Sequence, residues 1–191
     1  LGAWGKNIEK TLRSLPNCTL AYTATEDWRE LLEKKDIDGA VIATPPATHA
    51  EIAVAFLQRG VPVFIEKPMT GSLKDALAIE AAARVSGAPV MVGHLHLYSP
   101  AYRKTKELAS GIGALRRIMS EGGNNGPYRG DYSAMWDWAP HDLSMILDIT
   151  GEMPESVSAW AEAPLRPGTA LWDAAAVFTN SRASEAARAA S

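Results

Sequence analysis

Short apolar runs alternate with helical patterns in the middle of the chain. Three runs predict strands, at residues 39–43, 61–65 and 90–93, and each is apolar throughout, as parallel strands covered on both faces are. Between them, residues 48–59 and 73–86 have helical spacing. Strands and helices that alternate with short loops predict an α/β fold with a doubly wound parallel sheet.

The first part of the chain has weaker patterns. A helical pattern with its apolar residues on one face runs up to Pro16. Residues 19–22 then predict a short strand, and residues 26–35 a small helix with acids in its first turn and lysines in its last.

The strand–helix rhythm changes after residue 96. We predict a helix at 100–110, strands at 115–119 and 156–161, and a helix that starts at Asp137 with Pro140 in its first turn, where a missing N–H costs nothing. A loop rich in Gly and Asn precedes that last helix.

Composition and charge narrow the class of protein. The net charge of −3 over 191 residues gives no bulk attraction to nucleic acid or to an anionic membrane, and we expect neither as a partner. The sequence has no apolar run of spanning length and no basic-then-apolar leader. The single cysteine, Cys18, excludes an internal disulfide framework. We expect a cytoplasmic protein.

The segment Glu66-Lys67-Pro68 follows the 61–65 run directly. Open α/β sheets bind ligands beyond the carboxyl ends of their strands, so a lysine at this point is well placed for chemistry. The alternative is a solvated ion pair at an ordinary strand end.

A second chemical candidate is the pair Asp137 and His141, which are four apart and share a face of the predicted helix. Histidine can accept a proton at neutral pH, and the carboxylate could orient its ring. Asp137 could equally be a helix N-cap, and His141 a half-buried structural histidine. Trp136 and Trp138 could stack on a ligand or pack in the core.

Two further histidines, His94 and His96, alternate as on a strand and would face opposite ways. They suit a domain junction better than a metal site, because no clustered acid or thiol accompanies them, and we expect no metal.

Near the start, Gly2 and Gly5 have the spacing of the last two glycines of a G-x-G-x-x-G loop, which binds a pyrophosphate at a helix N-terminus. The strand that should precede such a loop is absent, and a plain helix start is the alternative.

Four pieces of sequence together carry a resemblance to a known family. They are Gly2-Ala3-Trp4-Gly5, residues 41–49, Glu66-Lys67-Pro68, and residues 136–142. In this order the chain resembles the glucose–fructose oxidoreductase/inositol dehydrogenase (Gfo/Idh/MocA) family over roughly residues 1–162.

The resemblance implies NAD or NADP as cofactor and hydride transfer from a hydroxyl carbon of a sugar, nucleotide sugar or polyol. It implies three catalytic residues, Lys67, Asp137 and His141. The implied cofactor-binding residues are Gly2, Ala3, Trp4, Gly5, Thr44, Pro45, Pro46, His49, Glu66, Lys67 and Pro68, with Thr44, Pro45 and His49 on the nicotinamide side. The implied substrate-binding residues are His94, Asn124, Asn125, Arg129 and Trp136.

The resemblance also implies two domains. Residues 1–96 would form a Rossmann domain with its first strand and second-strand region incomplete. Residues 97–191 would form an incomplete α+β domain whose open, mostly antiparallel sheet covers the nicotinamide and joins subunits into a dimer or tetramer. Because family members are longer, we expect these residues to be a subset of a longer chain, with joins near 20–25 and 178–184.

From these observations we expect an NAD(P)-dependent oxidoreductase acting on a sugar, nucleotide sugar or polyol. One alternative is a non-catalytic sensor that binds the dinucleotide. The other is a lyase or glycoside-cleaving relative that recycles a tightly held NAD.

Overall fold

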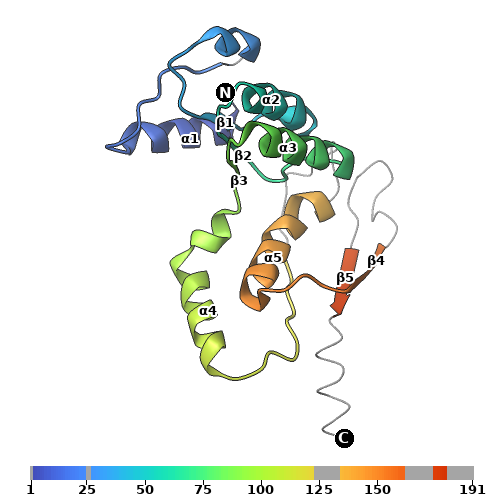
Figure 1. Ribbon diagram of the computed structural model, residues 1–191. Helices are drawn as coiled ribbons and strands as arrows, with labels where there is room; N and C mark the ends of the chain where they lie inside the picture. Colours follow the sequence, from blue (N-terminus) through green and yellow to red (C-terminus); the bar gives the residue numbers. More distant parts are fainter. Residues whose placement is uncertain (1, 25–26, 123–133, 162–173, 180–191) are drawn as a thin grey trace, which may run out of the picture. The chain divides into compact units, whose positions relative to one another are not determined.

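The computed structural model describes residues 2–24, 27–122, 134–161 and 174–179 (Figure 1). The chain divides into two compact units, Leu1–Gly93 and His94–Ser191, and each is described by itself. Among the described residues, no helix has both the length and the apolar character needed to cross a bilayer.

A three-stranded parallel sheet forms the centre of the first unit, as predicted. Its strands β1 (Ala40–Ile42), β2 (Val63–Ile65) and β3 (Val90–Val92) lie in the order β1-β2-β3. Ala40 lies opposite Val63, and Val63 opposite Val90. Each strand is shorter than the apolar run that predicted it.

Two helices connect these strands, α2 (Pro46–Gln58) and α3 (Leu73–Ser86). Pro46 begins α2 two residues earlier than predicted, because a first-turn position does not need its missing N–H. Ser72 caps α3 by accepting a hydrogen bond from the Asp75 backbone N–H, and Gly87 ends it in the left-handed region at φ 72°. Both α3 boundaries agree with the sequence prediction.

The core of the first unit lies between this sheet and the two connecting helices, which lie side by side in Figure 1. Successive right-handed crossovers in one direction place both helices on the same face of the sheet. The buried core residues are Ile42, Ile52, Ala53, Phe56, Leu57, Val63, Ile65, Ile79 and Ala88.

The opposite face of the sheet carries a row of three side chains that lie in register, Val41, Phe64 and Met91. Val41 is 41% exposed and Met91 is 44% exposed. The expectation that these strands are covered on both faces is therefore wrong for this row, because α2 and α3 pack on the other face.

The N-terminal segment begins with α1 (Ala3–Ser14), in agreement with the helical pattern up to Pro16. The strand predicted at 19–22 does not form. Instead the Tyr22 hydroxyl lies 3.0 Å and 3.1 Å from the two carboxylate oxygens of Asp36 and donates to them. This bond raises the pKa of Tyr22.

The small helix expected at 26–35 is a 3₁₀ helix, η1 (Trp28–Glu33). The Asp27 carboxylate caps it by accepting from the Arg29 backbone N–H. The Trp28 ring packs against Phe56 of α2 at a centroid separation of 6.3 Å, which fixes η1 to the core.

The second unit contains a 3₁₀ helix, η2 (Leu95–Tyr98), two α-helices, α4 (Pro100–Gly111) and α5 (Ala134–Thr150), and two strands, β4 (Ser156–Ala161) and β5 (Ala174–Thr179). The strands pair antiparallel, with Ser156 opposite Thr179. The α4 and β4 predictions are confirmed, whereas the sequence patterns did not predict β5.

Two predictions for this unit are wrong. Residues 115–119 form no strand and are exposed, since no neighbouring strand is there to pair with them among the described residues. The last helix starts at Ala134, so Pro140 lies inside it and Asp137 lies in its first turn rather than at the N-cap. Pro140 therefore leaves the Trp136 carbonyl without its intrahelical partner.

Candidate active site

The carboxyl ends of the three parallel strands define one edge of the first unit. The Glu66 backbone N–H donates to the Ile42 carbonyl at 2.9 Å, and the Gly93 N–H to the Ile65 carbonyl at 2.8 Å. These bonds extend the ladder by one residue and keep the following turns at the same edge. They position Thr44, Lys67 and Gly93 where ligands of open α/β sheets bind.

The turn after β2 carries the candidate lysine. Lys67 is half-buried, Pro68 is buried, and the peptide bond between them is cis. Thr70, also buried, donates from its hydroxyl to the Ser72 carbonyl at 2.7 Å, which connects the turn to the start of α3. The side chain of Lys67 thus projects from a backbone that is held on both sides.

The Glu66 side chain lies over Gly93 of the neighbouring strand end. A Cβ atom at Gly93 would lie 3.1 Å from a carboxylate oxygen of Glu66 and 3.1 Å from the Phe64 ring. Only glycine at this position leaves the Glu66 and Phe64 side chains where they are.

His49 lies in the N-terminal half of α2 and is 1% exposed. Its Nε2 is 2.8 Å from the Thr44 carbonyl oxygen, and its Nδ1 is 3.1 Å from the Pro68 carbonyl oxygen and 3.2 Å from that of Met69. One buried ring therefore contacts the turn after β1 and the turn after β2.

The N-terminus of α1 offers backbone donors. Gly2 is the N-cap in an extended conformation, and no side chain caps the first turn. Nothing lies within 4 Å of the Cβ position of Gly2, Gly5 is buried, and Trp4 is exposed. First-turn N–H groups of this kind, together with the helix dipole, suit an anion such as a pyrophosphate.

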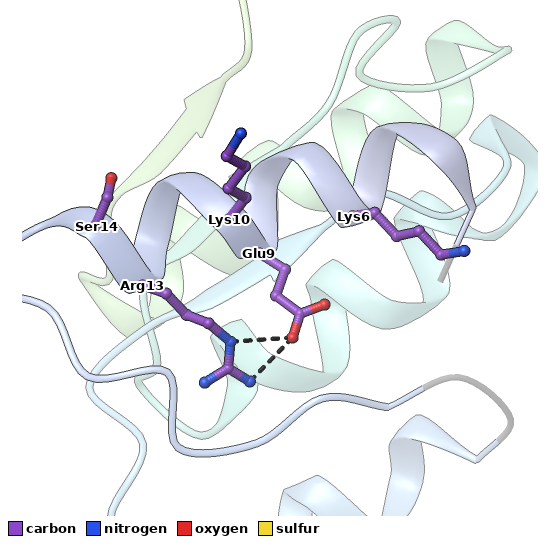
Figure 2. Close-up of a pocket in the computed structure, with 5 residues that line it drawn as sticks. All are labelled: Lys6, Glu9, Lys10, Arg13 and Ser14. Carbon is purple, nitrogen blue, oxygen red and sulfur yellow. Dashed lines mark hydrogen bonds and ion pairs between the residues drawn. The ribbon is translucent and has the colours of Figure 1, made fainter.

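A hollow of about 410 Å³ lies elsewhere on α1 and is lined by Lys6, Glu9, Lys10, Arg13 and Ser14 (Figure 2). Arg13 donates to the Glu9 carboxylate at 2.9 Å and 3.1 Å, which offsets part of the positive charge. The hollow contains none of the predicted site residues, so we place the candidate chemistry at the strand ends.

In the second unit, Asp137 and His141 are one helical turn apart on α5, and His141 is 8% exposed. The His96 ring meets the His141 ring edge-on, with centroids 4.4 Å apart, and Trp138 lies at 6.2 Å. His141 is therefore enclosed by aromatic rings on two sides.

His96 contacts the candidate base His141, and the sequence patterns did not select it as a candidate. Residues 94–98 do not alternate as a strand, because Leu95–Tyr98 is a 3₁₀ helix with His94 at its N-cap. His94 is half-buried, burial lowers its pKa, and its Nδ1 has no hydrogen-bond partner among the described residues. A pattern of two histidines flanking a leucine gave no signal that the second one contacts α5.

The structure describes only some of the other predicted substrate residues. Trp136 is exposed on α5. Asn124, Asn125 and Arg129 lie outside the described residues. Within the described part of the chain, no three His, Cys, Asp or Glu side chains form a group that could hold a metal ion.

Comparison with known proteins gives a family match in the first unit and relatives that match over part or most of the chain. Residues 3–94 match the Gfo/Idh/MocA family model, described as an oxidoreductase family with an NAD-binding Rossmann fold. Scyllo-inositol 2-dehydrogenase (NAD(+)) of Bacillus subtilis is 34% identical over 82 residues, which is 43% of this chain and 24% of that protein. Inositol 2-dehydrogenase 2 of Saccharopolyspora erythraea is 32% identical over 148 residues, 75% of this chain and 43% of that protein.

The likeness to solved structures covers up to 94% of this chain. A protein of Magnetospirillum magnetotacticum assigned as an oxidoreductase is 36% identical, with a TM-score of 0.85 over 94% of this chain and 64% of its own. GenD2 from gentamicin A biosynthesis, solved in complex with NAD, shares the fold at 23% identity and a TM-score of 0.68, over 82% of this chain and 48% of its own. The chain spans less than half the length of both inositol dehydrogenases.

Proposed function

Because residues 3–94 match the Gfo/Idh/MocA oxidoreductase family model, we propose that the protein belongs to that family and is an NAD(P)-dependent dehydrogenase of CH–OH groups. Its substrate class is a sugar, nucleotide sugar or polyol. The observation that carries the proposal is the family match over the same unit that brings Thr44, Lys67 and Gly93 to one strand edge. Relatives named as inositol and UDP-N-acetylglucosamine dehydrogenases support the substrate class.

The residues of the first unit fit a dinucleotide. The uncapped first turn of α1, from Gly2 to Gly5, supplies N–H donors for a pyrophosphate. Thr44, Pro45 and Pro46 after β1, together with the Glu66-Lys67-Pro68 turn after β2, would bind the cofactor at the strand ends. When bound, the nicotinamide supplies the acceptor or donor of the hydride.

We assign three roles to the chain's own side chains. Oxidation of a carbinol requires loss of the hydroxyl proton, and the His141 ring accepts that proton as a general base. Asp137, one turn earlier on α5, orients the ring and stabilises its protonated form. The Lys67 ammonium stabilises alkoxide character on the reacting oxygen.

The test is turnover with NAD⁺ and NADP⁺ against a panel of polyols, sugars and nucleotide sugars, followed by nicotinamide absorbance. We expect His141→Ala and Lys67→Ala each to lower kcat by about 10²–10⁴-fold, with the cofactor Kd changed far less. Lys104→Ala, which removes an exposed lysine of α4, is the control and should leave kcat unchanged.

Three outcomes would contradict this assignment. Near-normal turnover of His141→Ala would remove its role as base. Cofactor binding without turnover of any substrate would indicate a sensor, and substrate cleavage without net cofactor reduction would indicate a lyase.

We also propose that β4 and β5 belong to an open, mostly antiparallel sheet through which two or four copies associate. Their antiparallel pairing over six residues each supports this role.

A further inference from the structure

Two turns of the candidate active site are joined by one buried side chain. The turn that follows β1 contributes the Thr44 carbonyl, and the turn that follows β2 contributes the Pro68 and Met69 carbonyls. The joining residue, His49, belongs to α2 and is 1% exposed. This side chain is too deeply enclosed to present a face to a ligand.

The chemistry of the three contacts restricts the ring. A backbone carbonyl oxygen only accepts hydrogen bonds, and a neutral imidazole has one N–H and one lone pair. Nε2 and Nδ1 both face carbonyl oxygens, at 2.8 Å and at 3.1 Å and 3.2 Å. The ring therefore contacts carbonyl oxygens of both turns, and a neutral ring donates a hydrogen bond to one of them.

We propose that His49 is a positioning residue that ties the turn after β1 to the turn after β2 through the contacts of its two ring nitrogens, and so holds Lys67. The proposal rests on the dehydrogenase function given above. Pro68 and Met69 directly follow Lys67, so fixing their carbonyls fixes the peptide that carries the lysine.

The neighbouring residue Thr48 provides a control that distinguishes this role from ordinary packing in α2. The Thr48 hydroxyl lies 2.8 Å from the Thr44 hydroxyl and 2.8 Å from the Pro45 carbonyl, so its bonds stay within the turn after β1. Thr48→Val therefore loosens one turn. His49→Gln, whose amide has one nitrogen, cannot reach both turns and loosens their connection.

The first measurement is amide hydrogen exchange of peptides covering residues 43–48 and 66–72. We expect His49→Gln to raise exchange in both peptides by about tenfold, and Thr48→Val to raise it only in 43–48. Unchanged exchange of 66–72 in His49→Gln would overturn the proposal, whether or not the protein has dehydrogenase activity.

The second measurement uses the unaltered chain and needs no variant to fold. Nitrogen-15 NMR should find a His49 ring N–H that exchanges slowly with water, because it is buried and hydrogen-bonded to a backbone carbonyl. A ring N–H that exchanges as fast as that of an exposed histidine would overturn the proposal.

Kinetics complete the test. We expect His49→Gln to lower kcat more than it raises the cofactor Kd, because Lys67 is misplaced while the α1 site is intact. If the unaltered protein has no dehydrogenase activity but His49→Gln loosens both peptides, the positioning role stands and the proposed function fails. Equal losses of kcat in His49→Gln and Thr48→Val would contradict a role specific to Lys67.

Discussion

The contact between Glu66 and Gly93 joins the ends of two neighbouring strands. The carboxylate occupies space that any other residue would fill at position 93, with atoms only 3.1 Å from where a Cβ would lie. Gly93 does not have a positive φ, so it is space rather than backbone conformation that selects glycine here.

We predict that Gly93→Ala displaces the Glu66 carboxylate and weakens cofactor binding several-fold. The loss of unfolding free energy should be about 1 kcal/mol, because the Phe64 ring must also shift. Gly71→Ala is the matched control, since nothing lies within 4 Å of its Cβ position. Titration of NADH fluorescence measures both affinities, and an equal loss in the two variants would refute the steric argument.

At this scale, the sequence predicted the residues whose role is local. The bounds of the helix at 73–86 were predicted, because its caps Ser72 and Gly87 depend on the chemistry of a few adjacent residues. The contacts of His49 and His96 could not be predicted, because they join segments that are adjacent only after folding.

One hydrogen-bonded group holds the helices of the second unit together. The Tyr102 hydroxyl of α4 lies 2.6 Å from the Asp148 carboxylate and 3.0 Å from the Met145 carbonyl of α5. Lys106 donates to the same carboxylate at 2.8 Å. The bonds from Lys106 and Tyr102 lower the pKa of Asp148, while burial and the bond to Asp148 raise that of Tyr102.

We predict that Asp148→Asn destabilises the chain at pH 7 and that the difference disappears in acid. The folded-state pKa of Asp148 is lower than its unfolded value, so its contribution is complete above about pH 4 and is lost as pH falls through the folded pKa. Because the carboxylate is partly exposed, the expected loss at pH 7 is only about 1 kcal/mol.

Chemical unfolding at pH 7 and pH 3 measures the difference. Asp38→Asn, which changes an exposed acid outside this group, is the control. A destabilisation that is the same at both pH values would mean that Asp148 acts through shape rather than charge.

Prediction of the elements succeeded where apolar spacing and tertiary pairing agree. The segments that became β1, β2 and β3 have neighbours and form a sheet, whereas 19–22 and 115–119 have similar apolar residues but no partner strand among the described residues. The early start of α5 was missed because Pro140 was assumed to lie in a first turn. The structure shows instead that the helix accommodates it internally.

For the whole molecule, association of copies through β4 is the proposal that can be measured directly. Val157 of β4 is 56% exposed, so its apolar side chain is available for burial between copies of the chain. Light scattering after size exclusion should give two or four times the chain mass, and Val157→Arg should reduce it to the monomer. Val85→Arg, at a position 90% exposed on α3, should leave the mass unchanged. If the unaltered protein is a monomer, the proposal is wrong.

The strand order of the parallel sheet also bears on how β2, the strand that precedes Lys67, pairs with its neighbours. β1, β2 and β3 are neighbours both along the chain and across the sheet, and each pairing closes a loop of about 25 residues. Folding rates fall as contacting residues become more distant in sequence, and these pairings join strands that follow one another directly along the chain. The strand that leads to Lys67 therefore finds both of its neighbours within residues 40–92. Its pairing with both neighbours needs no contact with a segment outside residues 40–92.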